Sequence, residues 1–216
     1  MKKLVIAVDG PAGAGKSTVS KIVAEKLGIN YIDTGAMYRA VTYKCLKEGV
    51  DISDEKAVSD MAAKSDIDFR DNSIYLDGKS VNDEIRTVEV SSNVSDVAKI
   101  REVRYQMVEV QRRIGEKSSV ILDGRDIGSY VFPNADYKFY LVATAEERGN
   151  RRYKEMREKG FEVNLEDVIR DIVKRDEIDS NREFAPLVKA DDAIEIDTTG
   201  LGIDEVANKI IENIKL

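Results

Sequence analysis

The chain has 216 residues, of which 42% are hydrophobic and 35% are charged, with a formal net charge of −7, no histidine and one cysteine. This length allows one large domain with a buried core, and the acidic balance argues against nucleic-acid binding, which usually needs a basic surface. Histidine-based catalysis, internal disulfides and cysteine-based zinc sites are excluded. We see no signal peptide and no apolar run of membrane-spanning length, so we expect a cytoplasmic protein.

Strand-like and helix-like segments alternate along most of the chain. Residues 4–8 form an apolar run typical of a strand buried on both faces, and residues 16–27 have helical spacing that ends at Gly28, a helix C-cap residue. Further strands are expected at 30–33, 119–123, 137–142 and 193–197, and further helices at 36–48, about 95–113, 145–159, 164–179 and 203–214. This order predicts a parallel α/β sheet with right-handed crossovers.

The middle of the chain departs from that alternation. Residues 67–69 and 74–76 alternate apolar and polar side chains around the turn residues Asp71, Asn72 and Ser73, and Asp77–Gly78 signals a second turn. We interpret this segment as a small antiparallel sheet inserted into the α/β chain as a separate lobe.

The run from Gly10 to Ser17 matches the phosphate-loop pattern G-x-x-x-x-G-K-[ST] without a mismatch. Its glycines would let backbone N–H groups point at a phosphate at the N-terminus of the following helix. Lys16 would reach the β- and γ-phosphate oxygens, and the Ser17 hydroxyl would hold Mg²⁺. A buried strand precedes the loop and an amphipathic helix follows it, so a chance match is a poor explanation. The loop predicts binding of a nucleoside triphosphate, and leaves the phosphate acceptor open.

Charged residues also follow two other predicted strands. Arg39 comes shortly after the strand at 30–33, and Asp123-Gly124-Arg125-Asp126 closes the strand at 119–123. Ligands of open α/β sheets bind at the carboxyl ends of the strands. There Asp123 would occupy a Walker-B position that orients Mg²⁺ through water, and the arginines would face phosphate. Taken alone, Arg39 is better explained as a solvent-exposed arginine, and the D-G-R-D run is unremarkable as a turn; the gathering of these charges at strand ends favours a site.

The predicted helix from Asn164 changes character along its length. Its apolar stripe, in steps of three and four, is continued at the same spacing by charged residues: Leu165, Val168 and Ile172, then Arg175, Asp179 and Arg182. Buried charges need partners, so this end of the helix either forms a structural ion-pair network or faces a polar cleft. If the helix ends before Arg182, the argument covers only Arg175 and Asp179.

Two further features concern an arginine-rich helix, for which two interpretations stay open, and the single cysteine, for which a structural role is favoured. The arginine-rich helix at 145–159 is either a mobile flap that closes over phosphates or a solvated face stabilised by Glu–Lys pairs. Cys45 lies on an apolar helical stripe, which favours a structural core thiol over a reactive one.

Taken together, these stretches resemble the bacterial cytidylate kinase family over essentially the whole chain. The resemblance is carried by Asp9–Thr18, Asp33–Arg39, Glu84–Thr87, Val103–Arg104, Asp123–Gly128 and Asp179–Leu187. It implies a P-loop three-layer fold with a central five-stranded parallel sheet, an inserted monophosphate-binding lobe with a small antiparallel sheet, and a short helical lid. The expected core is 1–35 and 91–216, with the lid at about 147–163 and the lobe at 36–90.

The resemblance also implies ATP-dependent phosphorylation of CMP and dCMP with Mg²⁺, by a monomer that binds neither nucleic acid nor membrane. The expected catalytic residues are Lys16, Arg39, Arg125 and Asp126. The donor nucleotide would contact Gly10, Pro11, Ala12, Gly13, Ala14, Gly15, Lys16, Ser17, Thr18 and, from the lid, Arg148 and Arg152, with Ser17 as metal ligand. The acceptor would contact Thr34, Arg39 and Arg125 through its phosphate, Arg175 and Asp179 through its ribose, and Ser95, Arg104 and Arg182 through cytosine. Thr34 stands where the family often has serine, and the hydroxyl is retained.

Two other functions are compatible with the phosphate loop. One is a different small-molecule kinase acting on UMP, AMP or shikimate, against which the expected base-contacting set argues. The other is a P-loop switch or regulatory ATPase that binds partner proteins. The N-K-x-D run that a GTPase would use to recognise guanine does not occur in the sequence.

Overall fold

The computed structural model describes residues 3–70 and 72–215, and its centre is a parallel sheet of five strands in the order β2-β6-β1-β7-β8. The strands are β1 (Val5–Asp9), β2 (Asn30–Asp33), β6 (Val120–Gly124), β7 (Tyr137–Val142) and β8 (Ile194–Asp197). In the register, Asp9 pairs with Gly124 and Asp33 with Asp123. The predicted parallel sheet is therefore confirmed, and the acidic ends of three adjacent strands meet at one edge.

Helices cover both faces of this sheet. α1 (Lys16–Leu27) and α8 (Ile203–Glu212) share one buried cluster with the strands, and α2 (Thr34–Lys47) lies in the cluster on the other face. Alternate residues of β1 divide between the two, since Ile6 and Val8 belong to the first cluster and Ala7 to the second. This alternation makes both faces of a parallel strand apolar, which explains the uninterrupted hydrophobic run at the start of the chain.

The predicted antiparallel lobe is present as a three-stranded sheet in the order β3-β4-β5, with β3 (Ile67–Arg70), β4 (Ser73–Leu76) and β5 (Lys79–Ser80). Asn72 and Asp77 take left-handed conformations, with φ of 57° and 49°, as turn residues do. Asp71 of the first predicted turn lies outside the described residues. Apolar side chains of β3 and β4 enter the same cluster as α2.

A short helix that we did not predict precedes this small sheet. α3 (Glu55–Ala63) is capped by Asp54, whose carboxylate accepts a hydrogen bond of 3.0 Å from the N–H of Ala57. It buries Val58 and Ala62, one turn apart. The apolar stripe of this helix is only two turns long, which is too short for helical periodicity to identify it reliably.

The prediction of one long helix at about 95–113 is wrong. The chain instead forms α4 (Val88–Lys99) and α5 (Arg101–Gly115), with the short helix η1 (Glu84–Arg86) before them. The break falls at Ile100, which is extended at φ −66° and ψ 120° and buried. Because the residue at the break is apolar and neither glycine nor proline marks it, the hydrophobic spacing continues through the break.

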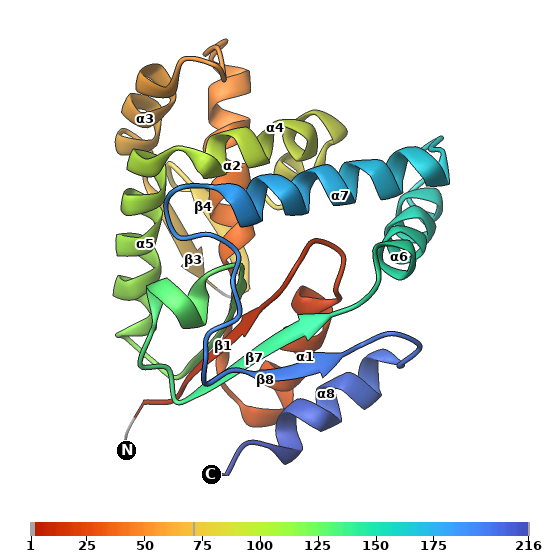
Figure 1. The fold of residues 1–216 in the computed structure, drawn as a ribbon. Helices are drawn as coiled ribbons and strands as arrows, with labels where there is room; N and C mark the ends of the chain where they lie inside the picture. Colours follow the sequence, from red (N-terminus) through yellow and green to blue (C-terminus); the bar gives the residue numbers. More distant parts are fainter. Residues whose placement is uncertain (1–2, 71, 216) are drawn as a thin grey trace.

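The last part of the chain places two helices beside the carboxyl ends of the strands. α6 (Ala145–Glu158) and α7 (Leu165–Asn181) follow the predicted ranges closely, and a π-helical turn, η2 (Ile127–Val131), follows β6. Figure 1 shows α7 lying across the molecule above the strands, in contact with α4 and α6. α7 ends at Asn181 and its C-cap Arg182 is extended, so the helical phase of the charged stripe covers Arg175 and Asp179 and does not reach Arg182.

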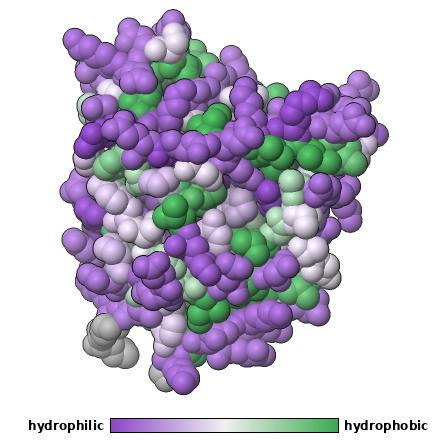
Figure 2. All heavy atoms as spheres, in the orientation of Figure 1, coloured by the Kyte–Doolittle hydropathy of each residue, from purple (hydrophilic) through white to green (hydrophobic). Residues whose placement is uncertain are grey.

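The surface agrees with the acidic, highly charged composition. Figure 2 shows a mainly hydrophilic face on which apolar residues form small, separate areas. Within residues 3–70 and 72–215, no helix has the length and apolar character needed to span a bilayer.

Candidate functional site

The loop from Gly10 to Ser17 joins β1 to α1, as its motif predicts. Gly13 and Gly15 have φ of 76° and 85°, a region that glycine enters at no steric cost. A Cβ on Gly10 would lie 2.2 Å from the carbonyl oxygen of Leu141, so the loop passes β7 more closely than a side chain would permit. The loop thus turns tightly at the N-terminus of α1, the setting in which backbone N–H groups bind phosphate.

Lys16 is buried against this loop. Its Nζ donates a hydrogen bond of 2.6 Å to the carbonyl oxygen of Pro11. Burial, and then the positive charge of Arg125, lower the pKa of Lys16 well below its usual value. An anionic ligand at the loop would offset both effects, because it supplies a negative charge beside a cation that has lost its water.

Asp123 at the end of β6 lies against the same loop. One carboxylate oxygen accepts a hydrogen bond of 2.7 Å from the Ser17 hydroxyl and the other accepts one of 2.8 Å from Tyr31. Burial, helped by the negative charge of Asp33, raises the pKa of Asp123 to about 6. Among the described residues, no group of three or more histidine, cysteine, aspartate or glutamate side chains could hold a metal by itself. A hydroxyl and a carboxylate fit Mg²⁺, which prefers hard oxygen ligands and keeps positions for phosphate and water.

Beyond the loop, five predicted residues form a chain of alternating charges. Arg104 on α5 donates to Asp126, whose other carboxylate oxygen lies 3.2 Å from Arg182. Arg182 also lies 3.7 Å from Asp179, which accepts a hydrogen bond of 2.8 Å from Arg125. Burial alone would raise the pKa of Asp179, but the surrounding arginines outweigh it and lower that pKa. We call these five residues the charge network.

Positive charge exceeds negative charge around the charge network. Arg39 forms an ion pair of 2.7 Å with Asp33, and burial together with repulsion from Arg125 lowers the pKa of Arg175 to about 10. In the part of the chain that the structure describes, the buried Nε atoms of Arg39, Arg104 and Arg175 have no hydrogen-bond acceptor. Buried donors of this kind are costly, so the cluster is suited to an anionic ligand that would accept from them.

Two predicted hydroxyl groups have different surroundings. Thr34 is the first residue of α2, and its hydroxyl donates a hydrogen bond of 2.7 Å to the carbonyl oxygen of Asp123. This bond ties the start of α2 to the end of β6. Ser95 lies on the buried face of α4, the helix that packs against α7.

The two predicted lid arginines of α6 also differ from each other. Arg148 is buried and donates to the carbonyl oxygens of Ala143 at 3.0 Å and of Ala12 in the phosphate loop at 2.7 Å. Arg152 forms an ion pair of 2.9 Å with Glu155 and lies outside the charge network. The structure therefore places Arg148 against the backbone of the phosphate loop and Arg152 at the half-exposed surface of α6.

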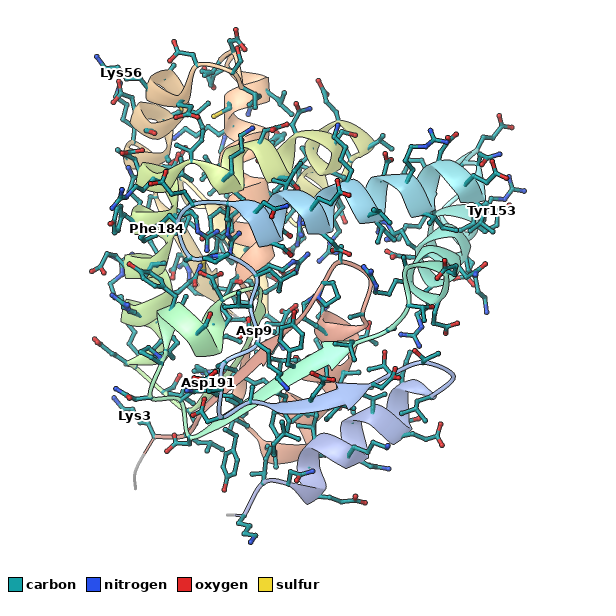
Figure 3. The ribbon with its side chains drawn as sticks, in the orientation of Figure 1. Lys3, Asp9, Lys56, Tyr153, Phe184 and Asp191 are labelled. Atoms are coloured by element: carbon teal, nitrogen blue, oxygen red, sulfur yellow. The ribbon has the colours of Figure 1, made fainter. Side chains whose placement is uncertain are left out.

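Asp9 supports the backbone directly after Asp126, at Ile127 and Gly128. Sequence analysis gave Asp9 no role of its own. Its two carboxylate oxygens accept hydrogen bonds from the N–H groups of Ile127 at 2.9 Å and Gly128 at 2.7 Å. Burial raises the pKa of Asp9 to about 7 although both hydrogen bonds oppose the shift. Figure 3 shows Asp9 near the centre of the molecule, with Phe184 and Tyr153 toward opposite sides of it. Asp9 thereby fixes the backbone just after Arg125 and Asp126.

Three other neighbours of the site were missed by sequence analysis. Asp33 pairs with Arg39, Asp176 on α7 contacts the phosphate loop, and Arg151 on α6 donates to Thr198 beside the loop. A signal existed for Asp176, because it lies four residues after Ile172 and so also continues the buried stripe of α7. Nothing in the spacing of α6 separates Arg151 from its charged neighbours.

Comparison with solved structures supports the fold. A structure from Eubacterium ventriosum, an uncharacterised protein, matches with a TM-score of 0.56 at 15% identity, covering 97% of both chains. A gluconokinase from Sinorhizobium meliloti matches with a TM-score of 0.50 at 12% identity, covering 98% of this chain and 92% of its own. At these identities the similarity concerns the fold alone.

Comparison with related sequences identifies the family. Residues 6–216 match the family model described as cytidylate kinase. A cytidylate kinase of Clostridioides difficile is 72% identical over 216 residues, covering 100% of both chains, and one of Bacillus subtilis is 53% identical over 218 residues, covering 99% of this chain and 97% of its own. With a phosphate loop and a cationic cluster at one sheet edge, and with these matches over its whole length, the chain belongs to the cytidylate kinase family.

Proposed function

We propose that this chain transfers the γ-phosphoryl group of ATP to CMP or dCMP, giving ADP and CDP or dCDP. The observation that carries the proposal is the pairing of two anion sites at the same edge of the sheet. The phosphate loop follows β1, and the arginine cluster gathers around the end of the adjacent strand β6. Two polyanions held this close need several cations between them. Lys16 of the loop and Arg125 of the cluster are near enough to affect each other's charge, so they lie at the boundary between the two sites.

On the donor side, the loop residues Gly10 to Thr18 would bind the ATP phosphates through backbone N–H groups. Ser17, together with Asp123, would hold Mg²⁺, which neutralises phosphate charge when it is bound. Lys16 would exchange its hydrogen bond to Pro11 for phosphate oxygens. Arg148 supports the loop backbone from the side, and Arg152 could reach the phosphates only by leaving Glu155.

On the acceptor side, the charge network and the residues around it would supply separate partners for phosphate, ribose and base. Arg39, Arg125 and Thr34 would bind the acceptor phosphate, and Arg175 with Asp179 the ribose. Ser95, Arg104 and Arg182 would contact cytosine. Asp126 pairs with both Arg104 and Arg182, so it would hold these two guanidinium groups in place for the base.

The reaction places modest demands on the protein's own chemistry. The acceptor phosphate oxygen is already a usable nucleophile, so alignment and charge neutralisation are what the side chains must supply. The absence of histidine from the sequence is therefore no obstacle. Closure of α6 and α7 over both nucleotides would exclude water, which would otherwise hydrolyse ATP.

A coupled assay of ADP release with CMP, dCMP, UMP, AMP and GMP as acceptors tests the proposal directly. We expect turnover with CMP and dCMP that far exceeds turnover with UMP, AMP or GMP. A preference for UMP or AMP would assign a different acceptor to the same fold. ATP hydrolysis that does not depend on any acceptor would contradict the kinase function.

Substitution of the two cations at the boundary tests their roles. Lys16→Ala and Arg125→Ala should each lower kcat/KM by about 10³-fold or more, because each removes charge stabilisation in a site that excludes water. Arg113→Ala, which removes an exposed arginine of α5, is the matched control and should keep normal activity. Circular dichroism and thermal unfolding check that the variants fold. A folded Lys16→Ala or Arg125→Ala protein with near-normal rate would refute the assigned role.

A cytoplasmic location and a monomeric state remain predictions of the sequence. Size-exclusion chromatography with light scattering, compared with the chain mass of 24.2 kDa, tests the second of these. A dimer would contradict it.

A further inference from the structure

Asp176 on α7 forms a compact set of contacts with the phosphate loop. Its Oδ1 accepts a hydrogen bond of 3.0 Å from the backbone N–H of Ala12, and its Oδ2 accepts one of 2.5 Å from Arg148. Arg148 in turn donates to the carbonyl oxygen of Ala12. Two side chains from α6 and α7 thus hold both backbone polar groups of one residue of the loop.

These contacts are shielded from water. The side chains of Arg148 and Asp176 are 8% and 18% exposed, and Ala12 is buried. A charge-assisted hydrogen bond at such a place is stronger than a neutral one at the surface. Without the carboxylate, the N–H of Ala12 would be left buried with no acceptor, and the loop would have to shift to satisfy it.

The position of Asp176 on α7 connects the loop to the acceptor side. The residue before it is Arg175, and Asp179, three residues later, accepts from Arg125. Burial opposes the charged form of Arg125, but Asp179 and, more weakly, the negative charge of Asp176 raise its pKa. One rigid helix therefore contacts the donor loop and the charge network within a single turn.

We propose that Asp176 is a positioning residue that holds the phosphate loop at Ala12 and transmits acceptor binding to the donor site. When a nucleoside monophosphate engages Arg175 and Asp179, it fixes the last turns of α7, and Asp176 then fixes the loop. The donor nucleotide meets a loop that is already ordered, so the two ligands bind with positive cooperativity. The part of this inference that concerns CMP rests on the proposed function, whereas the contact with the donor loop does not.

Titration calorimetry with ADP, alone and in the presence of saturating CMP, tests the inference without turnover. For Asp176→Ala we expect the Kd for ADP to rise about tenfold, the effect of one such hydrogen bond. The Kd for CMP alone should change by less than about twofold. In the unsubstituted protein CMP should tighten ADP binding by about threefold or more, and in Asp176→Ala that tightening should disappear.

Two further variants keep the test decisive. Asp176→Asn is nearly isosteric and keeps an acceptor for Ala12 while it loses the ion pair with Arg148, so the Kd for ADP should rise by only about threefold. This variant decides the question if Asp176→Ala does not fold. Glu177→Ala removes the neighbouring exposed carboxylate of α7 and should leave ADP binding unchanged.

Several results would overturn the inference. An unchanged Kd for ADP in folded Asp176→Ala, or in Asp176→Asn if only that variant folds, would show that the contact of Asp176 with the loop does not support ADP binding. Equal weakening of ADP and CMP would indicate general damage to the fold. An absence of coupling in the unsubstituted protein would remove the transmission. If the unsubstituted protein does not bind CMP at all, the proposed acceptor is wrong, and the ADP titrations still decide the part played by Asp176.

Discussion

Arg104 illustrates how a charged side chain is accommodated near the centre of the protein. It is almost completely buried, its guanidinium group pairs with Asp126, and it lies 5.3 Å from the centre of the Tyr38 ring. Burial opposes the charged form, but Tyr38 and Asp126 outweigh it and raise the pKa of Arg104. A buried guanidinium with such partners keeps its charge for a ligand.

Asp179 should contribute to stability in a pH-dependent way. Its pKa is lowered in the folded protein, so its stabilising effect is fully present above the unfolded value of about 3.9 and is lost as the pH falls through the folded value. We expect Asp179→Asn to lower the free energy of unfolding by about 3 kcal/mol at pH 7, since it leaves buried arginines without their anion. Urea unfolding at pH 7, 5 and 3.5 measures this difference.

The difference between Asp179→Asn and the unsubstituted protein should narrow toward pH 3.5. Asp171→Asn changes an exposed carboxylate of the same helix and is the control, with little expected effect at any of these pH values. A gap of the same size at pH 3.5 and pH 7 would mean that the ionised carboxylate is not the source of the stabilisation.

At the scale of single residues, the sequence predicted which charged residues gather at the sheet edge better than it predicted their partners in the protein. The tight turn of the loop from Gly10 to Ser17 was predicted because one continuous stretch of backbone forms it and its glycines mark the conformation. Asp33 and Asp9 were missed as site residues because their partners, Arg39 and the N–H groups of Ile127 and Gly128, depend on contacts that have no spacing of their own. Arg175 and Asp179 were found because a polar residue on a buried stripe violates an expected pattern.

Among the elements, the close packing of α6 against α7 depends on a glycine, Gly149 of α6. A Cβ on Gly149 would lie 2.3 Å from Cγ1 of Ile169 on the facing helix. The helices can be this close only because one of them has no side chain there. The close approach also brings Arg148, the preceding residue, within reach of Asp176.

Gly149→Ala should therefore separate the two helices. The clash costs about 1–3 kcal/mol and outweighs the gain in helix propensity of about 1 kcal/mol, so we expect a lower unfolding temperature. The KM for ATP should rise because Arg148 moves with α6. Thermal unfolding and steady-state kinetics measure both effects. Asn150→Ala, at the next and exposed position, should change neither, and a Gly149→Ala protein of full stability with unchanged KM would contradict the packing argument.

The elements themselves were predicted well where their patterns are long. The strands of the central sheet and the helices α1 and α7 follow apolar runs or stripes that tertiary packing reinforces. The break at Ile100 between α4 and α5 was missed because an apolar residue occupies it and both helices bury the same kind of face. Helical periodicity reports which side is buried, and it does not report a change in direction of the axis.

Across the whole molecule, charge is distributed unevenly. The formal net charge is −7, yet five arginines that pair with Asp33, Asp126 and Asp179 or lie beside these pairs gather at one edge of the sheet: Arg39, Arg104, Arg125, Arg175 and Arg182. A nucleotide approaching the protein is repelled by the overall charge and attracted only near this cluster. Added salt screens both effects, and the screening length falls from roughly 10 Å at 0.1 M to a few ångströms at 1 M.

Because the attraction acts at the site and the repulsion is spread over the surface, salt should weaken acceptor binding. We expect the KM for CMP to rise several-fold between roughly 0.05 and 0.5 M KCl with little change in kcat, since the closed site excludes ions. Initial-rate kinetics at fixed free Mg²⁺ measure this. Arg113→Ala should show the same salt dependence, and a KM for CMP that is constant or falls with salt would contradict the expectation.

The apolar cluster shared by α2, the central sheet and the antiparallel lobe contains Cys45, which is fully buried and is the only cysteine in the sequence. Burial raises the pKa of its thiol, so the sulfur is unreactive while the cluster is closed. The rate at which a small alkylating reagent labels the protein, divided by the rate for a free thiol, therefore gives the fraction of time for which this cluster is open. Arg39 lies on the same helix as Cys45, so a nucleotide that binds Arg39 should slow the labelling. The labelling rate of this one thiol would then report how nucleotide binding changes the opening of the apolar cluster.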